Sequence, residues 1–111
     1  MLQPVVPFSV ELRPARSVLV VRVCGEIDLF TAPKVRELVT EAVSDGWDSI
    51  VVDFRPVTFM DSAGVHLLSE LKGLDQQGVS CRMIDGSPAV RDVLTLVGAH
   101  GLLPSADPAL L

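Results

Sequence analysis

Apolar and polar residues alternate over residues 8–12, a spacing of two that is typical of a half-buried β-strand, and the mostly apolar residues 18–24 predict a second strand. The segment between them, residues 13–16, contains a proline and favours a turn. The pattern therefore predicts an antiparallel hairpin at one side of a sheet.

From residue 31 onward the apolar spacing changes to three and four, which places apolar side chains on one face of a helix. We expect Thr31 to cap this first helix, Pro33 to lie in its first turn and Gly46 to end it. The expected apolar stripe is Val35, Leu38, Val39, Ala42 and Val43.

The helical spacing returns twice later in the chain. A second helix should begin at Ser62 and close at Gly78, and a third should begin at Ser87 and end at Gly98. Their expected inward faces are Leu67, Leu68, Leu71 and Leu74 in one, and Val90, Val93, Leu94 and Val97 in the other.

The short β-branched run at residues 49–54 is typical of a strand covered on both faces, and residues 79–84 are predicted to form a further strand. The order strand, strand, helix, strand, helix, strand, helix predicts an α/β fold. It would be a small mixed sheet of four to five strands, with right-handed crossovers that pack helices against it. We expect one domain over residues 1–111, with a proline-broken ending, residues 101–108, that runs over the surface or docks loosely.

Composition and charge narrow the classes of function. Apolar residues make up 49% of the chain and charged residues 21%, which fits a compact soluble domain. The net charge of -5 argues against a nucleic-acid partner and favours protein partners. Cys24 and Cys81 lack the spacing of metal ligands, so we expect buried free thiols and no metal.

The start of the chain, residues 1–7, lacks the basic and then apolar pattern of an export signal. No later segment is apolar over a membrane-spanning length. We therefore expect a cytoplasmic protein without a membrane partner.

Ser62 is the residue whose surroundings suggest chemistry, because it lies at the expected mouth of the second helix, directly after Asp61. Unpaired backbone N–H groups and the positive end of the helix dipole would accommodate a phosphate there. The alternative is a plain helix cap, since both residue types are common caps.

Catalytic motifs around Ser62 are incomplete. A nucleophile elbow needs a glycine two residues before the serine, where this chain has Met60. His66 follows one helical turn later and could approach the serine, but a surface histidine is the simpler interpretation. Gly73 and Gly78 begin like a phosphate-binding loop but lack the following lysine. These residues favour a protein that is not an enzyme.

Three separated segments carry a more specific signal: Gly25-Glu26-Ile27-Asp28 with Thr31-Ala32-Pro33, then Val57-Thr58-Phe59-Met60-Asp61-Ser62-Ala63-Gly64, and then Ser87-Pro88-Ala89-Val90. In this order they resemble a loop, the phosphorylation segment and the last helix of the STAS domain family, in particular its bacterial anti-sigma factor antagonists. The resemblance spans nearly the whole chain and implies a single STAS-like domain.

The resemblance implies a protein that binds an anti-sigma factor and so frees a sigma factor. In this family the anti-sigma factor is itself a serine kinase with a histidine-kinase-like ATPase fold. It would phosphorylate Ser62 and thereby switch the protein off, and a PP2C-type phosphatase would reverse the step. ATP and magnesium belong to these partners, so no cofactor is expected in this chain.

The same resemblance assigns roles to individual residues. Ser62 is the phosphoacceptor, Asp61 should orient its hydroxyl and cap the helix, and Ala63 and Gly64 should keep the helix start narrow enough for a kinase. Asp28 should contact the partner from a loop beside Ser62, although an Asx turn explains it equally well. The expected partner-binding residues are Gly25, Glu26, Asp28, Thr31, Met60, Asp61, Ala63 and Gly64.

Two positions depart from the family pattern, and two other functions stay open. Ala63 stands where many members have a second serine, and His66 stands where a small or apolar residue is usual. A STAS domain can also serve as a fixed subunit of a lipid-transport complex or a signalling scaffold without phosphorylation. A serine hydrolase that uses Ser62 and His66 is the remaining alternative.

Overall fold

The computed structural model describes residues 6–111, and within them five strands and three α-helices form one layered fold. The expectation about an export signal rests partly on residues 1–5, which lie outside the described residues. The elements are β1 (Ser9–Ala15), β2 (Val18–Ile27), α1 (Ala32–Ser44), β3 (Ser49–Asp53), β4 (Val57–Met60), α2 (Ser62–Lys72), β5 (Ser80–Ile84) and α3 (Pro88–Leu96), with 3₁₀ helices at Gly73–Gln77 and Pro108–Leu110.

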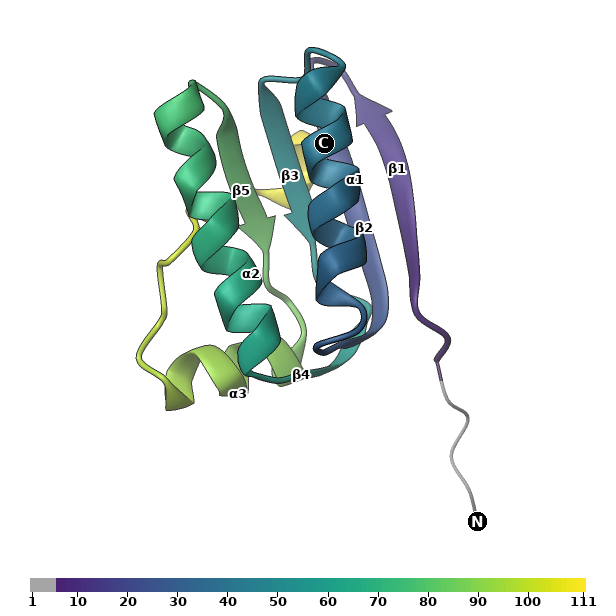
Figure 1. Ribbon diagram of the computed structural model, residues 1–111. Coiled ribbons are helices and arrows are strands. Elements are labelled where there is room, and N and C mark those ends of the chain that lie inside the picture. The colour runs from purple at the N-terminus through teal and green to yellow at the C-terminus, as the bar shows by residue number, and fades with distance from the viewer. Residues whose placement is uncertain (1–5) are drawn as a thin grey trace.

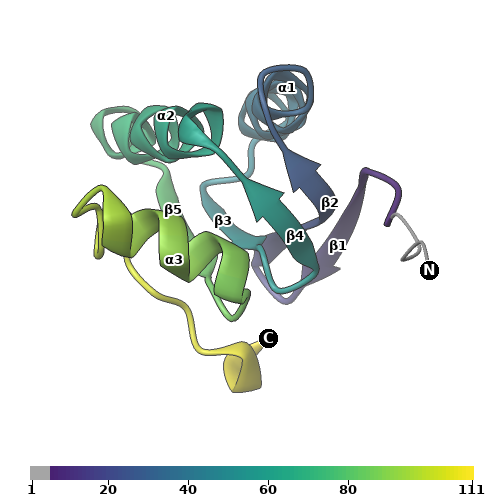
Figure 2. The ribbon, with the colours of Figure 1, turned by 90° about the horizontal axis from the view of Figure 1, so that it is seen from below.

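The sheet is mixed, as predicted. Its strand order is β1-β2-β3-β5, with β1 antiparallel to β2 and the other pairs parallel. Helices α1 and α2 cover one face of the sheet, α3 packs against β4, and the last residues of the chain lie on the opposite face (Figures 1 and 2). The predicted α/β fold with a small mixed sheet is therefore confirmed.

Strand β2 pairs with a different strand along each half of its length. Its first half pairs with β3, and its second half pairs with β4 after a register shift between Gly25 and Glu26. Gly25 has a φ of +91°, and a Cβ there would lie 2.9 Å from the Phe8 Cα, so a side chain would not fit. The predicted loop from Gly25 is thus wrong in its first part, because the strand continues to Ile27.

The helices bury the stripes that their spacing predicts, with exceptions at their ends. Leu38 and Val43 are only half-buried, whereas the other members of the α1 stripe are buried. Val97, which the spacing places inside, is exposed, because α3 ends at Leu96 and Val97 is its C-cap. Helix α2 ends at Lys72, ahead of the predicted Gly78, and a 3₁₀ helix fills the interval.

The hairpin and the C-terminal segment also differ from the prediction. Strand β1 continues through Ala15, so the turn is confined to Arg16 and Ser17, with a φ of +59° at Arg16. The ending does not dock loosely. Met83 N donates to Pro104 O at 2.9 Å, Ala106 N donates to Met83 O at 2.8 Å, and Leu103 is buried.

Both cysteines are free thiols, as predicted. Cys81 is buried, and this burial raises its pKa to about 12, which makes the thiol unreactive at neutral pH. Cys24 is only half-buried. Among residues 6–111, no group of His, Cys, Asp and Glu side chains could hold a metal ion. The same residues contain no helix long and apolar enough to cross a membrane.

Candidate functional site

Helix α2 begins at an exposed serine that follows a capping aspartate. Asp61 has an extended backbone, and its Oδ1 accepts a hydrogen bond from Ala63 N at 2.8 Å. Ser62 is the first residue of the helix, and its side chain is exposed. The predicted cap is confirmed. Within residues 6–111 no hydrogen bond joins Asp61 to the Ser62 hydroxyl, so Asp61 does not orient it in the expected way.

The end of β2 lies directly beside this helix start. Ile27 pairs with Met60, and Asp61 N donates to Ile27 O at 3.2 Å. Because β2 and β4 are parallel, both chains leave the sheet at the same edge. The predicted proximity of the Asp28 segment to Ser62 is therefore confirmed.

Asp28 and Thr31 lock the loop that connects β2 to α1. Asp28 Oδ1 accepts from Phe30 N at 2.9 Å and from Thr31 N at 3.0 Å, which is an Asx turn. These backbone donors hold the pKa of Asp28 below its usual value. Thr31 Oγ1 donates to Glu26 O at 2.7 Å and accepts from Asp28 N at 2.9 Å. Thr31 is the N-cap residue of α1, as predicted, but its hydroxyl makes no capping hydrogen bond to the helix and bonds within the loop instead.

This locked loop presents two large apolar side chains to solvent. Leu29 is 72% exposed and Phe30 is 78% exposed. Phe59, which pairs with Glu26 in the neighbouring ladder, is also exposed. Sequence reasoning missed these three residues, although their position within or next to the motif segments was a usable signal. They form an exposed apolar rim beside the start of α2.

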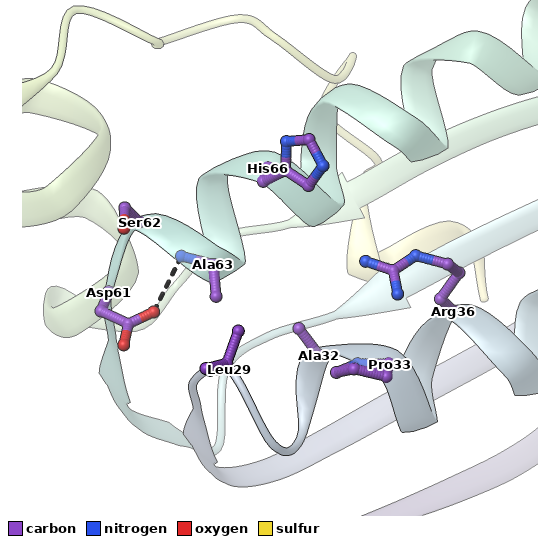
Figure 3. Close-up of a pocket in the computed structure, with 8 residues that line it drawn as sticks. All are labelled: Leu29, Ala32, Pro33, Arg36, Asp61, Ser62, Ala63 and His66. Atoms are coloured by element: carbon purple, nitrogen blue, oxygen red, sulfur yellow. Dashed lines mark hydrogen bonds between the residues drawn. The ribbon is translucent and has the colours of Figure 1, made fainter.

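A pocket of about 490 Å³ opens between the starts of α1 and α2. Figure 3 shows the two helices facing each other across it, with Ser62 and Asp61 at one end and Arg36 and His66 toward the other. Its lining residues are Leu29, Ala32, Pro33, Arg36, Asp61, Ser62, Ala63 and His66.

A charged cluster spans the two helices beside this pocket. Arg36 Nη2 donates to Glu70 Oε1 at 2.5 Å, and Arg36 Nε lies 2.5 Å from Glu70 Oε2. His66 Nε2 lies 3.5 Å from Glu70 Oε1. Among residues 6–111 no hydrogen bond joins His66 to Ser62, so the imidazole faces a carboxylate and not the serine.

Three of the expected partner-binding residues are buried. Met60 is 3% exposed, and Gly25 and Gly64 are also inside. A Cβ on Gly64 would collide with Met60 Cγ and lie 2.8 Å from its Sδ. Gly64 therefore lets α2 dock on β4, which differs from the expected role of clearing space for a kinase. Glu26 is exposed, and Ala63, like Asp28, Thr31 and Asp61, is half-buried.

The family follows from a match over almost the entire described chain. The model of the STAS domain matches residues 9–107. The chain belongs to the STAS domain family. Its mixed sheet and its three helices are thus those of a STAS domain.

Named relatives share both sequence and fold with this STAS domain. An anti-sigma F factor antagonist from Paenibacillus polymyxa is 32% identical over 102 residues, which cover 90% of this chain and 87% of the relative. The anti-sigma factor antagonist SpoIIAA in its unphosphorylated form is 28% identical, with a TM-score of 0.70 over 93% of this chain and 90% of that one.

A third similar structure is the Bacillus cell fate determinant SpoIIAA in the phosphorylated form. It is 27% identical, with a TM-score of 0.65 over 93% of this chain and 94% of that one. The unphosphorylated and the phosphorylated form of SpoIIAA thus both share the fold of this chain.

Proposed function

We propose that this STAS protein is an anti-sigma factor antagonist that is controlled by phosphorylation of Ser62. Without the phosphate it binds an anti-sigma factor that is also a serine kinase, and so frees a sigma factor. With the phosphate it no longer binds. The observation that carries the proposal is Ser62 itself, exposed at the first position of α2 on the rim of the pocket.

The apolar rim supplies the contact surface in this proposal. Leu29, Phe30 and Phe59 are large, exposed and adjacent to the β2 and β4 ends that flank Ser62. Burial of such side chains is the usual source of affinity at a protein interface. Asp28 contributes by holding the loop in place through its Asx turn. The names of the relatives support an anti-sigma factor as the occupant of this surface.

The switch needs no change of fold. A phosphate adds about -1.5 to -2 charges at neutral pH, and the N-terminus of α2 compensates part of that charge within the domain. At the interface the same charge would meet apolar or acidic partner surface, and like-charge juxtaposition costs several kcal/mol. That cost corresponds to an affinity loss of about a hundredfold or more.

The remaining residues of the site either determine how the surrounding elements pack or lie at the surface near Ser62. Gly25, Met60 and Gly64 are buried and fix how β2, β4 and α2 meet, while Glu26 and Ala63 lie at the surface beside Ser62. The proposal assigns ATP and magnesium to the kinase, and removal of the phosphate to a PP2C-type phosphatase. This exchange takes place in the cytoplasm, where sigma factors act, and the chain itself catalyses no step of it.

Co-purification with site variants tests the proposal. Tagged wild type, Ser62→Ala and Ser62→Asp are expressed in the source organism, and captured proteins and phosphorylation sites are identified by mass spectrometry. Ser62→Ala should retain an anti-sigma kinase at least as well as wild type, and Ser62→Asp should lose it. Ser69→Asp is the matched control, because Ser69 is an exposed serine two turns further along α2.

Each alternative has its own outcome in this experiment. Capture of a transporter ATPase or a scaffold complex, without a sigma regulator, would favour a fixed structural subunit. Equal loss of the kinase in Ser69→Asp would show that the effect is not specific to the start of α2. Labelling of Ser62 by a fluorophosphonate would indicate a hydrolase, and we expect none because His66 faces Glu70.

A further inference from the structure

Three residues on α2 share one face of the helix and differ in charge. Ser62, His66 and Glu70 follow at intervals of four, which places them one above another along the helix. Ser62 and His66 line the pocket, and Glu70 contacts both His66 and Arg36 of α1. A phosphate on Ser62 would therefore lie at the N-terminal end of this helix face, with His66 between it and the carboxylate of Glu70.

The cationic side chains of this cluster retain unused donors. Arg36 Nη2 donates to Glu70 Oε1, and Nε lies 2.5 Å from Glu70 Oε2 without forming a hydrogen bond to it; within residues 6–111 Nη1 has no hydrogen-bond acceptor. A guanidinium offers five N–H donors, so Arg36 can serve a second anion without releasing Glu70. His66 is exposed, and its only charged contact among these residues is at 3.5 Å. Figure 3 shows the Arg36 side chain extending from α1 toward α2, and His66 on α2 between Ser62 and the level of Arg36.

The balance of charge around the pocket favours a further anion only with these cations in place. The charged and titratable groups that line or touch the pocket are Arg36, His66, Asp61 and Glu70. Arg36 pairs with Glu70, and the Asp61 carboxylate caps α2. A phosphate on Ser62 would lie beside the Asp61 carboxylate, so its oxygens need N–H donors, which Arg36 and His66 can supply.

We propose that Arg36 and His66 form a receiving site for the phosphate of phosphorylated Ser62, so that the phosphoserine is held within the domain across the pocket. This inference rests on the proposed phosphorylation of Ser62. It adds which side chains of the domain itself bind the phosphate. The held phosphate occupies the opening between α1 and α2, so it blocks the partner by position as well as by charge. His66, which departs from the family pattern, gives this chain its own contact to the phosphate.

Phosphorus NMR of a protein with phosphoserine installed at position 62 tests the receiving site. The phosphoserine is incorporated during translation, so the test needs no kinase and does not depend on any partner. The pKa of the second phosphate proton is about 6 in an unperturbed phosphoserine. In the wild-type chain its titration midpoint should lie at least about half a unit lower, because nearby cations favour the dianion.

The variants separate the receiving site from general electrostatics. His66→Gln and Arg36→Gln should each move the midpoint back up by a few tenths of a unit or more, and the double variant further still. Lys72→Gln is the matched control, because it removes the same charge from the opposite end of α2 and should leave the midpoint unchanged. His66 is exposed, so its variant is expected to fold like wild type.

Equal midpoints in wild type, His66→Gln and Arg36→Gln would overturn the receiving site. An equal shift in Lys72→Gln would also overturn it, since the effect would then come from net charge. Neither result bears on whether unphosphorylated Ser62 binds an anti-sigma factor, so the two proposals fail separately.

Discussion

At the scale of single residues, Asp61 has a structural and an electrostatic role that can be separated. Its carboxylate caps α2 through Ala63 N, and it also places a negative charge beside Ser62. Asp61→Ala should lower the free energy of unfolding by about 1 kcal/mol, the usual worth of an N-cap. Asp61→Asn should stay near wild type, because asparagine caps equally well.

Urea denaturation of the two Asp61 variants measures this difference. A loss of stability in Asp61→Asn as large as that in Asp61→Ala would contradict the capping role and assign the effect to charge.

The ion pair between the buried Asp53 and the exposed Arg55 makes the stability of the fold depend on pH in the acid range. Burial by itself would raise the pKa of Asp53, but the hydrogen bonds and charge of Arg55 outweigh it and hold the pKa below 3.8. Arg55 binds both carboxylate oxygens, at 3.0 and 2.8 Å. Because the folded-state pKa is the lower one, this stabilisation is complete above about pH 4 and is lost as the pH falls through the folded-state pKa.

Asp53→Asn should therefore weaken the acid dependence of stability. Urea midpoints between pH 5 and pH 2 should fall less steeply in the variant than in wild type. The exposed carboxylate of Asp92 on α3 provides the control, and Asp92→Asn should retain the wild-type slope. Identical slopes in Asp53→Asn and wild type would contradict the role given to the Arg55 pair.

At the scale of elements, the approach of α2 to β4 depends on the absence of a side chain at Gly64. A Cβ there would collide with Met60, which is itself buried. Gly64→Ala should lower the free energy of unfolding by about 1–3 kcal/mol, despite the better helix propensity of alanine. Gly73 offers a control, because it has a helical φ and a Cβ there would meet none of the described residues within 4 Å.

Gly73→Ala should thus be neutral or stabilise the protein by up to about 1 kcal/mol. Thermal unfolding of both variants makes the comparison. A Gly64→Ala protein as stable as Gly73→Ala would show that α2 and β4 are less tightly fitted than this packing implies.

The elements that could be predicted from sequence are those whose signal is local. The stripes of α1 and α2 repeat over several turns, and the Asp61 cap stands directly before its helix. Strand β4 was not predicted, because four residues with two exposed side chains carry no clear alternation. It exists through its pairing with the second half of β2, which is about thirty residues away in the chain.

The same distinction holds for the candidate site. Ser62, Asp61 and their proximity to Asp28 follow from adjacent motifs and from strand ends, so the sequence suffices to locate them. The contact of Arg36 with Glu70 joins residues 34 positions apart and depends on how α1 and α2 lie side by side. No pattern in the amino-acid sequence predicts a contact between residues so far apart.

At the scale of the whole molecule, the C-terminal segment completes the fold. Leu103 is 2% exposed in the main core, and Ser105 after it forms a single parallel bridge with Met83 of β5. Leu103→Ala should lower the free energy of unfolding by about 2–4 kcal/mol, as expected for a buried leucine. The exposed Leu110 is the control, and Leu110→Ala should change stability by less than about 0.5 kcal/mol.

Chemical denaturation of these two variants decides the point. A Leu103→Ala protein within about 0.5 kcal/mol of wild type would mean that the segment docks loosely after all.

The whole molecule behaves in this account as a rigid scaffold with one switchable contact point. The sheet and helices hold the apolar rim and Ser62 at one edge, and under the proposed function a phosphate would change the charge of that edge without changing the fold. Because the relative SpoIIAA has a similar fold in its two forms, binding and not folding should report the switch.

The most direct measurement is the dissociation constant for the anti-sigma factor, determined by calorimetry with two forms of the full chain. One form carries serine at position 62 and the other carries phosphoserine. We expect the phosphate to weaken binding by about a hundredfold or more, with unchanged circular dichroism. Equal dissociation constants for the two forms would contradict it.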